Sequence, residues 1–308
     1  MEIKKVLKDY DLIETEPIKL VRESMDNAVF VVGKKDKKVL RISKRLPIED
    51  IKFEYEAMAY LSKNGLPVAN WLLTRSGDFY TLADGSVAVM FEFINGHHVL
   101  IDKDHFPTSV QVFNAGRELG LMSNVAEKFK LSFSRKRDVF TEFNRVISVS
   151  NTFIKNFEGG KEFTVQVEEA IKFGKNQKEA IGLLHNDYRS GNVFFNSKDS
   201  VKGIIDFDWS CMGPVIKDLA LAVVEWSFPD GRTEPNWELF DAFLAGYNST
   251  AKNKYEKGAL LYSWIKFATL SDACTYFCDL ANDTGLTKKV IKSYMYMKYL
   301  FFSNLYKK

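Results

Sequence analysis

The sequence predicts an α+β fold in which a strand-rich first part precedes a larger, mainly helical part. Two observations lead to this prediction. Three β-rich runs joined by polar turns, IKLVRES, AVFVVGKK and KKVLRISK, stand near the start of the chain. After residues 93–107 the apolar residues recur at helical spacing almost to the end. We therefore expect an N-terminal lobe over residues 1–94 and a C-terminal helical lobe over residues 95–308.

The elements follow from this pattern in order along the chain. The first three strands are expected near 18–24, 28–35 and 37–44, and PIEDIKFEYEAMAYLSKNG is the next helix, which Gly65 ends. Residues 71–94 then read as two or three more strands with glycines in their turns. The expected helices of the second part are 108–129, 136–157, 161–177, 216–227, 235–250, 255–281 and 287–304.

The composition excludes several classes of protein. With 43 basic and 40 acidic residues the 308-residue chain has a formal charge of +3, so charge gives no reason to expect a nucleic acid or a membrane surface as partner. KFKLSFSRKR, the one strongly basic run, is interpreted as a solvated loop and helix start. No apolar run approaches the roughly 20 residues that span a bilayer, and the first residues lack the apolar core of a secretory signal. We expect a cytoplasmic monomer or homodimer whose three cysteines are reduced thiols.

Chemistry-bearing residues concentrate in LLHNDYRSGNVFFNSKDSVKGIIDFDW, residues 183–209. An antiparallel hairpin centred near Asp199 would pair residues whose numbers sum to about 398, which places Asn192 opposite Asp206. Opposed residues lie about 5 Å apart between Cα atoms, close enough for an amide oxygen and a carboxylate to share one hard cation. Two such oxygen donors, with room for water and phosphate, predict a Mg²⁺ site.

The turn that leads into the hairpin carries a third candidate. Asp187 is expected to face the same space without a metal to neutralise it, which suits a carboxylate that accepts a proton from a substrate hydroxyl. Arg189 adds a cation that could stabilise the charge of the migrating phosphoryl group. His185 is interpreted as a buried scaffold rather than as the base. Asp208 could touch a second metal ion or be solvated, and the second interpretation is preferred.

These motifs resemble those of a known group of enzymes. HNDYRSGN followed by IIDFD is similar to the catalytic and metal loops of the aminoglycoside phosphotransferase and choline kinase-like superfamily, whose usual forms are H-G-D-x-x-x-x-N and I-D-[FW]. The downstream GPVIKDLA resembles that superfamily's G-x-x-x-x-D-L-A segment, in which Asp218 is interpreted as a brace for the catalytic turn. The resemblance implies a two-lobed protein-kinase-like fold, a first lobe that binds ATP, and a phosphotransferase that needs Mg²⁺.

The same resemblance implies the nucleotide contacts. VLRIS is similar to the strand whose basic residue holds the phosphates, and the next helix supplies that residue's partner. The implied cofactor-binding residues are Arg41, Glu54, the amides near Asn27, and the backbone of Glu92, Phe93 and Ile94. The chain departs from the pattern in having Arg41 where a lysine is usual in protein kinases, Asn186 where a glycine is usual, and no glycine in ESMDNAVFVV.

The acceptor is less clearly indicated. Residues 209–308 contain 10 acidic and 12 basic residues, whereas a site for a polycationic aminoglycoside should be rich in carboxylates. VVEWSFPDGRTEPNWELFDAFLAGY resembles the homoserine-kinase-like branch, which implies an acceptor pocket lined by Glu225, Trp226 and Asp230. We expect a small hydroxyl acceptor, namely an amino alcohol, a hydroxy amino acid such as homoserine, or a sugar. The alternatives are an aminoglycoside O-phosphotransferase and a catalytically inactive kinase-fold binding protein.

Overall fold

The structure, a computed structural model, describes residues 3–13, 16–24, 26–44, 46–133, 135–281, 289–290 and 293–305. The chain divides into two compact units. The first unit contains the residues up to His97 together with Lys130–Arg135 and Phe194–Asp208, and the second contains the rest. Two short segments beyond residue 97 therefore belong to the first unit, whereas the predicted lobes have a single boundary at residue 94.

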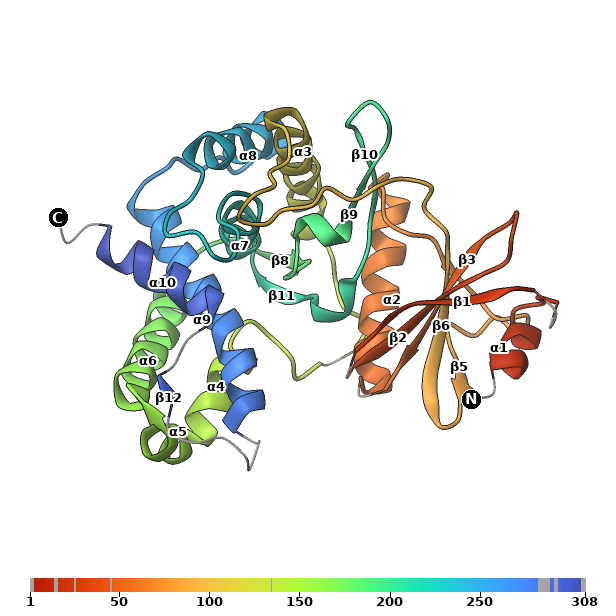
Figure 1. Ribbon diagram of the computed structural model, residues 1–308, viewed down its shortest axis with the longest axis horizontal. Helices are drawn as coiled ribbons and strands as arrows, with labels where there is room; N and C mark the ends of the chain where they lie inside the picture. The colour runs from red at the N-terminus through yellow and green to blue at the C-terminus, as the bar shows by residue number, and fades with distance from the viewer. Residues whose placement is uncertain are drawn as a thin grey trace. The chain divides into compact units, whose positions relative to one another are not determined.

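The first unit is built on an antiparallel sheet (Figure 1), whose strands lie in the order β1-β2-β3-β6-β4, with β5 paired to β6. The elements up to the end of this sheet are α1 (Ile3–Asp9), β1 (Ile18–Glu23), β2 (Asn27–Val32), β3 (Lys38–Ser43), α2 (Ile48–Lys63), β4 (Trp71–Leu72), β5 (Thr81–Ala83) and β6 (Ser86–Glu92). The predicted order of strands, helix and further strands is thus present.

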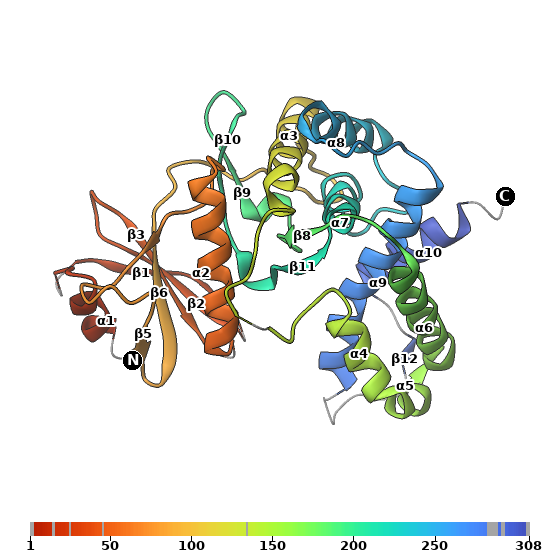
Figure 2. The same cartoon turned by 180° about the vertical axis from the view of Figure 1, so that it is seen from behind.

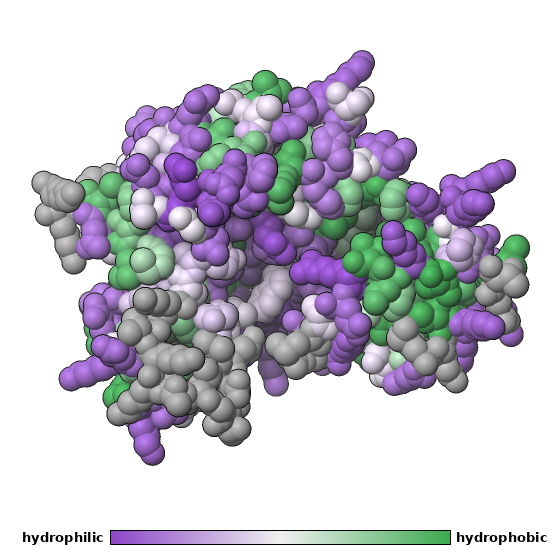
Figure 3. All heavy atoms as spheres, viewed as in Figure 1, coloured by the Kyte–Doolittle hydropathy of each residue, from purple (hydrophilic) through white to green (hydrophobic). Residues whose placement is uncertain are grey.

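One face of this sheet forms an apolar core. Alternate residues of β2 point into it, as period-2 geometry requires, and α1 covers them with Val6 and Leu7. The strand β1 is exposed along its length, including Leu20 and Val21, and Figure 3 shows a hydrophobic area over the sheet. The helix α1 was not expected from the sequence.

The helix α2 brings one carboxylate into an apolar setting. Its buried face repeats at helical spacing through Ile51, Glu54, Met58 and Leu61, so the glutamate lies within the apolar stripe. In β3, Leu40 and Ile42 belong to the core on the α1 side. Because side chains alternate along a strand, the intervening Arg41 points to the opposite face. This alternation places Arg41 on the side of β3 where it can form an ion pair with Glu54 of α2.

The second unit is mainly helical (Figure 2). Its elements are α3 (Ser109–Ala126), α4 (Thr141–Ser148), α5 (Ser150–Asn156), β7 (Phe157–Glu158), α6 (Gly160–Asn176), β8 (Ile181–Leu184), the 3₁₀ turn η1 (Ser190–Asn192), β11 (Cys211–Pro214), α7 (Val215–Ser227), α8 (Trp237–Thr250), α9 (Ala259–Ala281), β12 (Lys289–Val290) and α10 (Tyr294–Asn304). The mixed α+β class predicted from the sequence is confirmed.

Close helix packing fixes the scaffold of this unit. A Thr108–Gln111 capping box starts α3, which lies directly against α8. A Cβ atom on Gly116 would stand 2.2 Å from the carbonyl oxygen of Phe243, and one on Gly246 would stand 2.0 Å from that of Phe113. The two glycines therefore permit backbone contact between the helices.

Some predicted boundaries were wrong. The expected helix over 136–157 is two helices, because Val149 leaves the helical conformation with φ −119° and ψ 19°. The serines and the asparagine around it can bond to nearby backbone groups and so compete with the helix. In the expected helix 287–304, residues 289–290 form β12 and the helix covers Tyr294–Asn304, while 287–288 and 291–292 lie outside the described residues. Among the described helices, none is both long and apolar enough to cross a bilayer.

Candidate active site

A buried ion pair joins β3 and α2 in the first unit. Arg41 is 5% and Glu54 1% exposed, and the pair is bidentate, with Arg41 Nη1 donating to Glu54 Oε1 at 2.8 Å and Nη2 donating to Oε2. Burial acts to lower the pKa of Arg41, but the adjacent carboxylate outweighs it and raises that pKa above the usual value. The guanidinium is therefore a permanent positive charge. An arginine has five N–H donors, so three remain beyond those given to Glu54.

Two aspartates of the metal-loop sequence lie near this pair. Both Asp206 and Asp208 add to the charge effect that raises the pKa of Arg41. Asp208 is 7% exposed and its Oδ2 accepts from Asn27 Nδ2 at 3.1 Å, while Asn27 Oδ1 accepts from Ser43 Oγ at 3.0 Å. The preferred interpretation of Asp208 as a solvated residue was wrong, because Asp208 is buried and Asn27 provides it with an amide donor. The structure thus brings Asn27, Arg41, Glu54 and Asp206 together.

The other predicted nucleotide contacts lie at two strand ends and in the segment after β6 of the same unit. The backbone N–H of Asn27 donates to Ser24 Oγ at 3.0 Å, which orders the loop before β2 without a glycine. At the end of β6, the N–H of Glu92 donates to the carbonyl of Asn70 at 2.9 Å, and the carbonyl of Ile94 accepts from Gly96 at 3.1 Å. Phe93 is 37% exposed. The adenine contact of Glu92, Phe93 and Ile94 stays a prediction.

The hairpin predicted around Asp199 is present. The strands β9 (Val193–Phe195) and β10 (Val201–Ile204) pair, and the turn closes through the Asn196 N–H to the Ser200 carbonyl at 3.0 Å. Asn192 is the last residue of η1, directly before β9. Asp206 follows β10 by two residues and has a left-handed backbone with φ 69°. Both predicted metal ligands therefore flank the strands, and their shared cation stays a prediction.

In the second unit, the predicted base is held by two neighbours. Asp187 Oδ2 accepts from Asn192 Nδ2 at 2.8 Å and from Arg189 Nε at 3.1 Å, and the aspartate side chain stays 22% exposed. Asn192 Nδ2 also donates to the carbonyl of Asp187 at 2.9 Å. The carboxylate is thus oriented by one amide and one guanidinium while it still reaches solvent. The structure brings Asp187, Arg189 and Asn192 together, as the spacing suggested.

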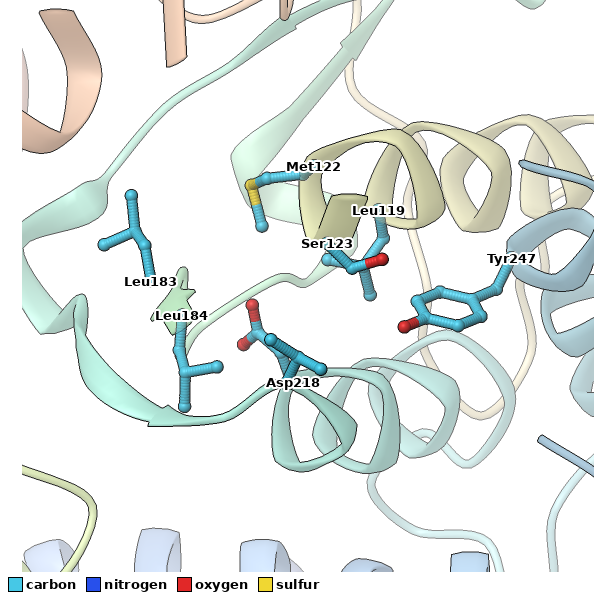
Figure 4. A pocket seen from close by; sticks show the side chains of 8 residues that line it. Leu119, Met122, Ser123, Leu183, Leu184, Asp218 and Tyr247 are labelled. Carbon is cyan, nitrogen blue, oxygen red and sulfur yellow. The ribbon is translucent and has the colours of Figure 1, made fainter. Parts of the chain in front are cut away.

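The turn that carries His185, Asn186 and Asp187, here called the catalytic turn, is held in place by hydrogen bonds to a residue of α7. Asp218 accepts from the backbone N–H groups of His185 at 2.7 Å and Asn186 at 2.8 Å. Figure 4 shows the side chains near this carboxylate, including Ser123 of α3 and Tyr247 of α8. His185 is fully buried, and its Nδ1 lies 3.3 Å from the backbone nitrogen of Asp187. Its surroundings agree with the scaffold interpretation.

Asn186 has a function that its position in the motif did not reveal. Its backbone is left-handed, with φ 66°, a conformation that glycine and asparagine tolerate best. Its side chain links two further segments, because Nδ2 donates to the Trp209 carbonyl at 3.1 Å and Oδ1 accepts from Lys217 Nζ. Lys217 is only 2% exposed. The residue that replaces the usual glycine therefore provides an acceptor for a buried ammonium group.

Substitutions of Asn186 should separate these two properties. Asn186→Gly keeps the backbone conformation but leaves Lys217 without this acceptor, so we expect a loss of about 1–3 kcal/mol in the free energy of unfolding and a lower kcat. Asn186→Ala should lower the free energy of unfolding by about 1 kcal/mol more than Asn186→Gly, because alanine adopts the left-handed region poorly. Urea unfolding and steady-state kinetics measure both effects. The same pair of substitutions at the exposed Asp11, with φ 55°, provides a reference for the backbone cost. A Gly variant as stable as the wild type would contradict the role of the amide.

The predicted acceptor residues have different surroundings. Glu225 is half-buried, and its Oε1 accepts from Lys298 Nζ at 3.1 Å. Trp226 is fully buried and its indole N–H donates to the Tyr188 carbonyl at 3.1 Å, so the ring supports the catalytic turn. Asp230 is exposed and its Oδ1 accepts from the next backbone N–H, that of Gly231, at 2.8 Å. Of the three, Glu225 has a charged side chain as its partner.

The basic run KFKLSFSRKR is partly built into the fold. Arg135 is 4% exposed at its side chain, donates to Asp50 Oδ1 at 2.7 Å, and lies 4.0 Å from the centre of the Phe53 ring. Arg137 lies 4.2 Å from the centre of the Trp209 ring. The interpretation of this run as solvated was therefore wrong for Arg135, which contributes to packing.

The predicted metal ligands suit a hard divalent cation by their chemistry. Because both bonds donated by the Asn192 amide go to Asp187, its Oδ1 is directed away from that residue, and Asp206 offers carboxylate oxygens. Such oxygen donors are the ligands of Mg²⁺. The three cysteines are buried free thiols, as expected, and the described residues contain no cluster of three or more His, Cys, Asp or Glu suited to a metal ion.

Comparison with known proteins agrees with this geometry. Residues 17–261 match the Phosphotransferase enzyme family. The homoserine kinase of Neisseria meningitidis serogroup B (strain ATCC BAA-335 / MC58) is 25% identical over 268 residues, which cover 84% of this chain and 82% of the relative. The match to the family covers both candidate clusters, that of Arg41 and that of Asp187.

Solved structures share the fold. The microcompartment-associated aminopropanol kinase superposes with a TM-score of 0.66 at 19% identity and covers 98% of this chain and 96% of its own. Amicoumacin kinase hAmiN, solved with AMP-PNP, Ca²⁺ and Ami, gives a TM-score of 0.73 at 16% identity and covers 99% and 92%. The protein-kinase-like fold implied by the motifs is thereby confirmed. The chain belongs to the phosphotransferase enzyme family, as a kinase that phosphorylates a hydroxyl group of a small molecule.

Proposed function

We propose that the chain is a Mg²⁺-dependent kinase whose acceptor is a small hydroxy amino acid or amino alcohol. The observation that carries this proposal is the partly exposed Asp187 carboxylate, oriented by Asn192 Nδ2 at 2.8 Å and Arg189 Nε at 3.1 Å. A carboxylate in such a setting can accept a proton from an acceptor hydroxyl. The homoserine kinase relatives support an amine-bearing acceptor rather than a sugar.

In the proposed reaction, the acceptor oxygen forms a bond to the γ-phosphorus of ATP as the bond from that phosphorus to the β–γ bridging oxygen breaks. ADP leaves, and the hydroxyl proton passes to Asp187. Arg41 is assigned to the nucleotide phosphates, for which donors beyond those bonded to Glu54 remain. Asn192 and Asp206 would hold Mg²⁺, which neutralises phosphate charge when bound. Arg189 would both orient the base and stabilise the transferred group.

A screen of hydroxylated metabolites tests this proposal. ADP release from ATP should depend on an acceptor such as L-homoserine or 1-aminopropan-2-ol, and it should stop when EDTA removes Mg²⁺. Aminoglycosides should support no comparable release. If Mg²⁺ and ATP raise the melting temperature but no acceptor in the screen promotes ADP release, the inactive binding-protein alternative is favoured.

A further inference from the structure

A buried lysine lies on the last helix, α10, within an aromatic stretch. Lys298 is 3% exposed, donates to Glu225 Oε1 of α7 at 3.1 Å, and its Nζ lies 4.8 Å from the centre of the Tyr294 ring. A buried ion pair contributes little net stability, because the loss of hydration offsets the attraction, and apolar residues of similar volume usually serve as well. The pair between α7 and α10 therefore suggests a role other than stability.

A second acid completes what we call the charged cluster, which consists of Glu225, Asp272, Tyr294 and Lys298. Burial and the nearby Glu225 raise the pKa of Asp272 to about 6, although Lys298 and two other cations act in the opposite direction. The helix α9, which carries Asp272, packs against both α7 and α10, which carry Glu225 and Lys298. Asp272 is half-buried and Tyr294 is 43% exposed, so solvent reaches this side of the cluster.

The charged cluster lies beside the catalytic turn. Trp226, the residue after Glu225, donates its indole N–H to the carbonyl of Tyr188 at 3.1 Å, and Tyr188 lies between Asp187 and Arg189 in the chain. A small molecule in contact with Glu225 or Tyr294 is therefore close to the proposed base.

Most of the charged cluster comes from sequence that the family match does not cover. The match ends at residue 261, whereas Asp272, Tyr294 and Lys298 follow it. The residues assigned to phosphoryl transfer all lie within the match. Its position beside the catalytic turn suits the charged cluster to select the acceptor.

The charges of the cluster indicate what that acceptor carries. A polycationic aminoglycoside would place positive charges beside Lys298 and Arg189, and a sugar has no charged group to offer the cluster. An amino alcohol has no group for the lysine, which keeps two N–H donors beyond the one given to Glu225. Building on the proposed function, we infer that Lys298 binds the carboxylate and that Glu225 with Asp272 binds the ammonium group of a zwitterionic hydroxy amino acid.

Three acceptors that differ by one group test this assignment. L-homoserine carries both charged groups, 3-aminopropan-1-ol lacks the carboxylate, and 4-hydroxybutanoate lacks the ammonium group. For the wild type, kcat/KM should be on the order of 100-fold higher with L-homoserine than with either analogue, as expected for losing a charged hydrogen bond. Lys298→Met should lower kcat/KM at least about tenfold for L-homoserine and leave that for 3-aminopropan-1-ol unchanged. Asp272→Asn should lower kcat/KM for L-homoserine and for 3-aminopropan-1-ol, and it should leave kcat/KM for 4-hydroxybutanoate unchanged.

Controls keep this test decisive. Because Lys298→Met leaves Glu225 buried without its partner, the double variant Lys298→Met/Glu225→Gln and the variant Lys298→Arg are measured beside it, with the Mg-ATP thermal shift as a test of folding. Lys257→Met removes the exposed pair with Asp241 (2.6 Å) and should change nothing.

The outcomes are distinct. The assignment of Lys298 would be overturned if the Lys298 variants lost kcat/KM equally for L-homoserine and 3-aminopropan-1-ol, or if the wild type preferred the amino alcohol. Either result would leave the proposed kinase activity in place. Failure of every amine-bearing acceptor in the wild type would overturn the proposed acceptor class, and the charged-cluster assignment with it.

Discussion

Asp187→Asn should lower kcat by about two to four orders of magnitude, the usual contribution of a positioned acid or base. Asparagine has nearly the same shape as aspartate and can still accept from Arg189 and Asn192, but it cannot take the proton of an acceptor hydroxyl. The affinity for Mg-ATP should stay close to that of the wild type. Turnover in saturating acceptor, with calorimetric titration of Mg-ATP, measures the two quantities.

Asp206→Asn provides the contrast. It removes a negative donor from the proposed metal site, so we expect weaker binding of Mg-ATP together with lower turnover. Asp241→Asn, on the exposed surface of α8, is the matched control for a lost aspartate charge and should behave as the wild type. If Asp187→Asn and Asp206→Asn lose nucleotide affinity equally, the division between a base and a metal ligand is wrong.

The parts of the site that sequence predicted are those encoded by short local patterns. The turn HNDYRSGN places Asp187 and Asn192 five residues apart, so one turn fixes the bond between them. Arg41 and Glu54 lie 13 residues apart, where strand alternation and helix spacing together predict which faces meet. In each case the relevant geometry is set by one element or by two neighbours in the chain.

The parts that sequence did not predict depend on distant residues. Asn27 and Asp208 are 181 positions apart, so no local pattern indicates that the Asn27 amide donates a hydrogen bond to the aspartate. Lys217 in VIKDLALAVV and Lys298 in YMYMKYLFF each interrupt an apolar stretch, and a lone lysine there usually extends its ammonium group to solvent. Both are buried, because Asn186 and Glu225 bind them. An isolated lysine on an apolar helix could have indicated a buried polar partner.

The last large effect concerns the Arg41–Glu54 pair. Glu54→Ala leaves the buried guanidinium without its carboxylate, and loss of one partner of a buried pair costs about 3–5 kcal/mol. Arg41→Lys keeps the charge but cannot reproduce the bidentate contact, so its cost should be smaller. Urea unfolding gives the free energy, and hydrogen exchange of the β3 and α2 amides shows whether the loss falls on these elements. Glu23→Gln, at the exposed pair with Lys44, should leave both measurements unchanged.

A double variant, Arg41→Met/Glu54→Met, separates the structural role of this pair from its proposed role in nucleotide binding. Apolar residues of similar size replace a buried ion pair at little cost, so the double variant should recover most of the stability lost in Glu54→Ala. It should nevertheless lose the thermal shift given by Mg-ATP, because the positive charge assigned to the phosphates is gone. If the stable double variant binds Mg-ATP as tightly as the wild type, Arg41 is only a structural residue and the phosphates are held by other groups.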